Sequence, residues 1–233
     1  MAQATQMNFK SRLYLILAGI FIASLVSSNL IFQKFFTWTP FGLYTFEISV
    51  GILPYPITFL VTDLLSELYG KKKANQVVIA GLVSSVFVMG IILLANALPQ
   101  KDGSPVDSET FNRVFGLFGP AVFASMAAYL TAQFIDIRMF HFWKRLTKGK
   151  HLWLRNNAST IVSQFVDTAA VLSLLCLAGV IEWSRFLPLL ENGFLFKVLV
   201  ALLDTPIIYG VIHLLKGKVD IAPYQEGIAN EGS

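Results

Sequence analysis

Long apolar stretches recur six times along the 233-residue chain, separated by short polar segments. Each stretch is close to the ~20 residues that a helix needs to cross a bilayer. The hydrocarbon interior offers no partner for backbone N–H and C=O groups, so a spanning segment satisfies them within a helix. The pattern therefore predicts an all-α membrane protein, a bundle of six transmembrane helices. The predicted spans lie near 13–32, 46–65, 76–98, 115–137, 157–181 and 194–215.

The basic residues are distributed unevenly between the two sides that these spans define. Thirteen Lys and Arg residues fall on the side of the chain termini, four fall on the opposite side, and Lys197 lies within the sixth run. Basic residues accumulate on the cytoplasmic side of membrane proteins, so both termini are expected there. We expect one integral membrane domain over 1–218 and a flexible cytoplasmic tail over 219–233.

The composition agrees with a membrane protein and argues against several other classes. Hydrophobic residues make up 55% of the chain and charged residues 14%, whereas a typical soluble domain is about 25% charged. The single cysteine allows no intrachain disulfide, and the three histidines lack the spacing of a zinc site. We predict no metal and no cofactor. The net charge is +4, and the basic residues lie between the apolar runs. Membrane topology explains this distribution better than contact with nucleic acid does.

The second apolar run contains a predicted break followed by two carboxylates. Pro54 and Pro56 each remove a backbone donor and disfavour helical geometry at the preceding residue, so the segment 51–56 is expected to interrupt a helix. Irregular backbone at membrane depth is tolerated where it lines a cavity. Asp63 and Glu67 follow at a spacing of four, which places them on one helical face near the cytoplasmic end of the run.

Polar stripes run along the fourth and fifth apolar runs. Gln133 belongs to the first stripe, and Gln164 and Asp167 belong to the second. Both runs contain the pattern Gln-Phe-(Ile/Val)-Asp, which is a weak indication of an internal repeat. A stripe at helical spacing lies on one face of its helix. We therefore expect each stripe to face the interior of the bundle.

The sixth run carries Lys197 and Asp204, seven residues apart, and a second expected proline break at Pro206. A charged residue at a helix centre costs about 2.5–3.5 kcal/mol on insertion, while each Leu, Ile, Phe or Val returns about 0.3–0.6 kcal/mol. Such a helix therefore still inserts, but its charges must face the bundle interior or water and find partners. The expected partner of Lys197 is Asp167 or Asp204.

Three classes of function fit an apolar bundle with buried charges. A small-molecule transporter needs a polar central cavity, and an intramembrane enzyme needs a nucleophile with its base, or a metal. The chain lacks the G-x-S-x-G and H-E-x-x-H patterns, which argues against an enzyme, and it has no Walker A sequence for ATP hydrolysis. The third class is a binding subunit of a larger complex. Composition does not separate the first class from the third.

One stretch resembles the signature of a known transporter family. Residues 54–71 read PYPITFLVTDLLSELYGK, which is similar to the signature of the queuosine precursor transporters, also called the vitamin uptake transporter family. Four other segments show weaker similarities and occur along the chain in the same order as in the family: Ser28-Asn29, 153–168, Phe196-Lys197 and Pro206. The resemblance implies six helices in the bacterial inner membrane. It also implies import of 7-cyano- or 7-aminomethyl-7-deazaguanine, or of queuine, for tRNA modification.

A 7-deazaguanine presents two adjacent N–H donors and a carbonyl acceptor, which a carboxylate and an amide or cation can meet. We expect Asp167 and Gln164 to bind the donor edge, with Lys197 balancing Asp167 or meeting the carbonyl. Asp63 and Glu67 are expected to hold a cytoplasmic gate. The predicted substrate-binding residues are Asn29, Asp63, Glu67, Gln133, Arg155, Gln164, Asp167, Lys197 and Asp204.

The expected partners are the small-molecule substrate and the lipid bilayer, with no direct contact to nucleic acid. A homo-oligomer is compatible with the sequence. Six helices of this size also resemble the membrane subunits that bind substrate in energy-coupling-factor importers, which require partner ATPases. That likeness is one of size and layout only, and it is kept as the alternative. Proton-coupled and facilitated transport both remain open at this stage.

Overall fold

In a computed structural model of the chain, the described residues are 9–116, 119–148, 150–179 and 181–215. Within them the protein is predominantly α-helical, which confirms the predicted class, and a short two-stranded hairpin is added. The expected tail over 219–233 lies outside the described residues. The helices are α1 (Phe9–Ile31), α2 (Tyr55–Tyr69), α3 (Lys71–Ala97), α4 (Ser108–Phe115), α5 (Gly119–Leu146), α6 (Leu152–Leu177) and α7 (Phe186–Leu215).

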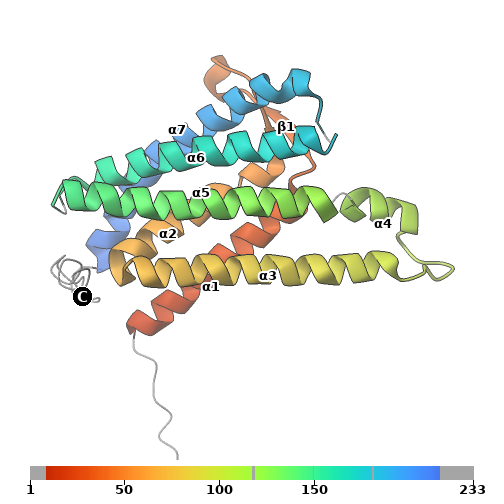
Figure 1. Ribbon diagram of the computed structural model, residues 1–233, viewed down its shortest axis with the longest axis horizontal. Helices are drawn as coiled ribbons and strands as arrows, with labels where there is room; N and C mark the ends of the chain where they lie inside the picture. The colour runs from red at the N-terminus through yellow and green to blue at the C-terminus, as the bar shows by residue number, and fades with distance from the viewer. Residues whose placement is uncertain (1–8, 117–118, 149, 180, 216–233) are drawn as a thin grey trace, which may run out of the picture.

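The long helices form one elongated bundle with two distinct ends (Figure 1). Helices α3, α5 and α6 run side by side, and α6 also packs against α7. One end, the basic end, carries Lys71–Lys73 at the start of α3 and Lys144 and Arg145 at the end of α5. The other end, the hairpin end, carries the hairpin and α4. The bundle therefore has a cationic end and, at the opposite end of its long helices, an end formed by the hairpin and a short helix.

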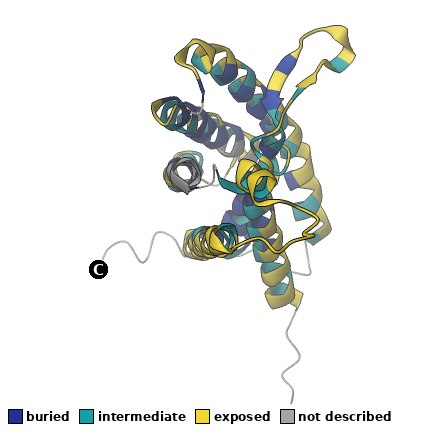
Figure 2. Ribbon diagram, turned by 90° about the vertical axis from the view of Figure 1, so that its right-hand side faces the viewer, coloured by how far each residue is buried: buried dark blue, intermediate teal, exposed yellow. Residues whose placement is uncertain are grey.

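Four described helical segments are long and apolar enough to cross a membrane: Phe9–Ile31, Lys71–Ala97, Asn157–Leu177 and Trp183–Leu215. Their most apolar stretches are at most 44% buried within the protein. Figure 2 shows exposed residues along the outer faces of the bundle and buried residues on the inner faces. In a bilayer, lipid covers such outer apolar surface, so helices that are apolar on all sides remain stable there.

The expected helix over 46–65 is wrong in its first part. Residues Phe46–Ser49 form strand β2, which pairs antiparallel with β1 (Phe35–Trp38), and a 3-10 turn covers Val50–Ile52. Phe46–Ser49 alternates apolar and polar residues, and this alternation favours a strand with one buried face. The break expected over 51–56 is present, because α2 begins only at Tyr55, directly after Pro54. With 15 residues, α2 is shorter than a full span.

The hairpin is fastened to its surroundings at both of its ends. Ser28 Oγ donates to the carbonyl of Gly51, and Ser49 Oγ donates to the carbonyl of Phe32. Between the strands, the tip exposes Phe41 and Leu43 almost completely. The hairpin is therefore fixed to the end of α1 while its tip points away from the packed core.

One other segment differs from expectation, and one further short helix lies outside the predicted spans for most of its length. Helix α7 runs through Pro206 without interruption, so the expected second break is absent there. Within the acidic segment 99–113, α4 begins after Asp107, whose Oδ1 accepts from the backbone N–H of Thr110 at 2.6 Å. Hydrogen bonds from Thr110 stabilise the carboxylate and lower the pKa of Asp107 below its usual value. A capped N-terminus explains why a polar loop sequence forms a short helix.

The core near α1, α2 and α3 depends on one close helix approach. Phe21 and Val78 are fully buried there, and Gly81 faces α1. A Cβ at Gly81 would lie 2.5 Å from Phe21 Cε1 and 3.1 Å from Leu25 Cδ2. On the same helix, a Cβ at Gly90 would meet nothing within 4 Å. Only the first of these glycines is required by packing.

Replacing Gly81 with alanine should therefore destabilise the protein, since overpacking a tight core costs about 1–3 kcal/mol. The measurement is the melting temperature of the purified protein in detergent, with Gly90→Ala as the matched control. We expect Gly81→Ala to melt several degrees below the wild type and Gly90→Ala to melt at or above it. Equal melting temperatures for the two variants would contradict this packing.

Candidate functional site

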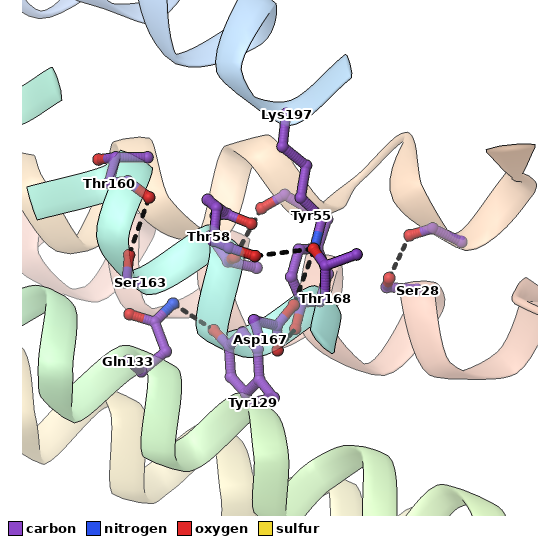
Figure 3. A network of polar contacts seen from close by, with 12 residues as sticks. Ser28, Tyr55, Thr58, Tyr129, Gln133, Thr160, Ser163, Asp167, Thr168 and Lys197 are labelled. Atoms are coloured by element: carbon purple, nitrogen blue, oxygen red, sulfur yellow. Dashed lines mark hydrogen bonds and ion pairs between the residues drawn. The ribbon is translucent and has the colours of Figure 1, made fainter. Parts of the chain in front are cut away.

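A buried ion pair joins two helices near the middle of the bundle (Figure 3). Lys197 Nζ on α7 donates to Asp167 Oδ2 on α6 at 2.8 Å and to Thr168 Oγ1 at 3.0 Å. The side chains of Lys197 and Asp167 are only 9% and 2% exposed. Of the two partners expected for Lys197, the structure therefore selects Asp167.

Helix α2 contributes a third member to this cluster. The hydroxyl of Tyr55 donates to Asp167 Oδ1 at 3.0 Å, and Lys197 Nζ lies 4.6 Å from the centroid of the Tyr55 ring. The ammonium thus contacts a carboxylate and an aromatic face at once, and both attract a cation electrostatically. The proline-induced start of α2 positions Tyr55 here, because Tyr55 is the first helical residue after Pro54.

A large pocket of about 140 Å³ opens beside this cluster, toward the hairpin end. Its volume is close to that of an engineered apolar cavity of about 150 Å³ that binds benzene, so it has room for an aromatic ring. Lys197, Asp167, Thr168 and Tyr55 form one polar end. The other lining residues are Ser28, Asn29, Phe32, Phe35, Glu47, Ile48, Ser49, Gly51, Ile52, Val171, Leu172, Leu175, Ile181, Leu189 and Gly193.

The wall of the large pocket contains one amide donor that the protein itself leaves unused. Asn29 Nδ2 is buried and has no hydrogen-bond partner among the described residues. Leaving such a donor unpaired costs about 1–3 kcal/mol, so a ligand acceptor is favoured at this point. On the carboxylate side, each oxygen of Asp167 has one hydrogen bond to Lys197 or Tyr55, whereas a carboxylate accepts about four. The pocket therefore offers both a free donor and spare acceptor capacity.

A second, small pocket lies on the other side of the cluster, toward the basic end. It holds only about 10 Å³. Lys197 and Tyr55 line both pockets and therefore separate them. Two more of the predicted residues, Gln164 and Asp204, line this small pocket. Its remaining lining residues are Pro56, Phe59, Thr160, Val200 and Ala201.

Three further predicted residues whose side chains are described, Gln133, Glu67 and Asp63, do not line these pockets. Gln133 is fully buried, but it donates to the hydroxyl of Tyr129 at 2.6 Å and accepts from Thr62 at 3.5 Å. Glu67 forms an ion pair of 3.2 Å with Lys144 at the basic end, and Asp63 is buried one helical turn away on α2. In a sequence, polar side chains that bind one another look the same as those that bind a ligand, so the roles of these three residues stay predictions.

For Arg155, the side chain lies outside the described residues.

The two copies of the pattern Gln-Phe-(Ile/Val)-Asp make different contacts in the structure. Asp136 accepts from Ser163 at 2.8 Å between α5 and α6, while Asp167 binds Lys197. The two copies of the pattern thus have different partners.

Sequence reasoning missed Tyr55 as a site residue, and it missed Glu47. Tyr55 lies within the stretch 54–71 but was not distinguished there from its apolar neighbours. A tyrosine immediately after a helix-breaking proline in a membrane segment was the available signal, because its hydroxyl needs a partner at that depth. Glu47 lines the large pocket and forms an ion pair with Arg185. Its position depends on the hairpin, which was expected to be helix.

Comparison with known proteins identifies the family. Residues 49–211 match the family described as “Putative vitamin uptake transporter”. The chain is 28% identical over 177 residues to the “Probable queuosine precursor transporter” of Bacillus subtilis (strain 168), which covers 74% of this chain and 75% of that protein. It is 27% identical over 131 residues to a protein of the same name from Haemophilus influenzae, covering 56% and 53%. No solved structure matches the chain.

The matched range contains the whole cluster, the whole small pocket and most of the large pocket. Tyr55, Asp167, Thr168 and Lys197 all lie within residues 49–211, as does the whole small pocket. Apolar helices long enough to cross a bilayer run through the same range. The chain is therefore a multi-pass membrane protein that belongs to the vitamin uptake transporter family.

Proposed function

We propose that this protein imports queuosine precursors, and that the large pocket binds their 7-deazaguanine ring. The names of the two bacterial relatives support the substrate class. The observation that carries the proposal is that the large pocket, which has room for a ring, is lined by Asp167 at its polar end and by Asn29 in its wall. Apolar residues such as Phe32 and Leu172 line the remaining wall, as is usual for pockets that bind flat ligands.

The chemistry of the ring matches this distribution of groups. A 7-deazaguanine presents a ring N–H and an exocyclic amine side by side, and the spare acceptor sites of Asp167 suit this pair of donors. The ring carbonyl needs a donor, for which Asn29 Nδ2 is available. Lys197 orients the carboxylate through its contact of 2.8 Å. Gln164 and Asp204, which line the small pocket, are not assigned to the ring.

The proposed orientation in the membrane rests on the two ends of the bundle. The excess of basic residues at the basic end supports a cytoplasmic location for that end by the positive-inside rule. The large pocket then faces outward, and its mouth lies next to the hairpin. In this orientation the cluster of Tyr55, Asp167 and Lys197 closes the path toward the cytoplasm. The protein would act in the bacterial cytoplasmic membrane.

The direct test uses bacteria that neither synthesise the precursor nor possess an importer. The chain is expressed there, and 7-cyano-7-deazaguanine, 7-aminomethyl-7-deazaguanine or queuine is supplied singly at nanomolar concentration. Queuosine in tRNA is then measured. Restored modification with one compound supports import without an added partner, and it argues against a subunit that requires separate ATPases. Absence of restoration by all three, with the protein present in the membrane, would refute the proposal.

Replacing Asp167 with asparagine should abolish uptake. The change removes the acceptor for the ring and leaves Lys197 buried without its carboxylate, a loss that typically costs 3–5 kcal/mol of stability. The double variant Asp167→Asn/Lys197→Met removes both charges, so its melting temperature should recover toward the wild type while uptake remains absent. Asp102→Asn in the exposed loop serves as the control and should retain uptake. Wild-type uptake in either Asp167 variant would remove Asp167 from the site.

A milder effect is expected for Tyr55→Phe, because this change removes one hydrogen bond to Asp167 and keeps the aromatic ring against Lys197. A hydrogen bond worth about 0.5–1.5 kcal/mol corresponds to a rise of roughly two- to tenfold in the KM of uptake. Tyr44→Phe, at an exposed tyrosine near the hairpin tip, should leave the KM unchanged. Uptake kinetics with labelled precursor measure both variants. An unchanged KM for Tyr55→Phe would show that Tyr55 does not orient the carboxylate.

A further inference from the structure

The charges of the central cluster and the small pocket do not balance. Lys197 is bound by Asp167, which neutralises both groups. Asp204 also lines the small pocket, and it forms no ion pair among the described residues. A carboxylate at membrane depth is costly unless it is paired or protonated. The described part of this region is therefore one positive charge short of neutrality.

The small pocket also contains oxygen atoms without partners. Thr160 and Gln164 are 5% and 3% exposed, and both line the pocket. Thr160 Oγ1 and Gln164 Oε1 are buried and form no hydrogen bond with any described residue. Together with the carboxylate of Asp204 they supply three kinds of oxygen ligand around one space. Hard oxygen ligands of this kind are what small inorganic cations prefer.

Size decides what this space can hold. At about 10 Å³ it is near the minimum for a single water molecule, so it excludes the purine-like ring proposed for the large pocket. An ion without most of its water shell, or a proton on the carboxylate, needs no more space than this. The other titratable groups that line the pocket are Lys197 from α7 and Tyr55 from α2, and α6 contributes only the neutral Thr160 and Gln164.

We propose that the small pocket binds one small monovalent cation, Na⁺ or a proton, at Asp204 with Gln164 and Thr160, and that its entry drives uptake. The coupling to uptake rests on the proposed function, whereas the cation site does not. Lys197 and Tyr55 border both pockets, so a charge in the small pocket acts on groups that hold Asp167. Binding in one pocket then alters affinity in the other, and the effect is reciprocal.

The cation site is tested first on the purified protein without substrate. Its melting temperature is measured in NaCl against choline chloride at equal ionic strength, and then across pH. A bound cation stabilises the folded state by mass action, so the wild type should melt higher in NaCl, or increasingly higher as the pH falls. Asp204→Asn should lose that dependence, and Glu191→Gln, at an exposed position on the same helix, should keep it. Identical Na⁺ and pH responses in wild type and Asp204→Asn would overturn the site.

Coupling is tested with wild-type protein in liposomes and labelled precursor. Exchange of internal for external precursor without an ion gradient reports transport itself, and its absence would count against the proposed function. An inward Na⁺ gradient or an inward proton gradient is then imposed, with the membrane potential clamped. One cation per substrate would give about tenfold accumulation for a tenfold gradient, and a protonophore abolishes it only in the proton case. Exchange without accumulation in either gradient would overturn the coupling, whatever the fate of the Asp204 variant.

Discussion

An ammonium and a carboxylate that are almost completely buried must meet each other, and the fold is arranged so that they do. Each ion alone would cost several kcal/mol in the interior, so Lys197 of α7 and Asp167 of α6 are stable only together, at 2.8 Å. Tyr55 satisfies the second carboxylate oxygen and shields the ammonium with its ring. Three helices are thereby held in one relative position, and both pockets take their shape from that position.

The break before α2 gives the cluster its aromatic member and also creates the mouth of the large pocket. A helix that continued from 46 to 65 would carry its early side chains across the bundle end. Instead the chain forms the hairpin, turns at Val50–Ile52 and begins α2 at Tyr55. Gly51 makes this turn possible, because a Cβ there would lie 2.7 Å from the carbonyl oxygen of Ser28. The short stretch from Val50 to Tyr55 thus produces the irregular turn, the close approach of Gly51 to Ser28 and the buried hydroxyl of Tyr55.

Hydrophobic patterning predicted the helical class and the approximate position of the long helices, because a span needs many consecutive apolar residues and leaves a strong signal. It also predicted that Lys197 must have a carboxylate partner. Patterning could not distinguish Asp167 from Asp204, since both lie on helices whose relative depth and rotation are set by packing. It failed at Phe46–Ser49, where an apolar run conceals an alternating strand, and at Pro206, which α7 tolerates. Patterning also could not reveal that Gln133 and Glu67 contact Tyr129 and Lys144, because these partners are distant in sequence.

The exposed tip of the hairpin is linked to the large pocket through the rest of the hairpin. Phe41 and Leu43 project from the hairpin end and are almost completely exposed. The same hairpin is tied to α1 through Ser28 and Ser49 and to the segment before α7 through the ion pair of Glu47 with Arg185. Any displacement of the hairpin therefore also moves the wall of the large pocket, because Phe35, Glu47 and Ile48 belong to both.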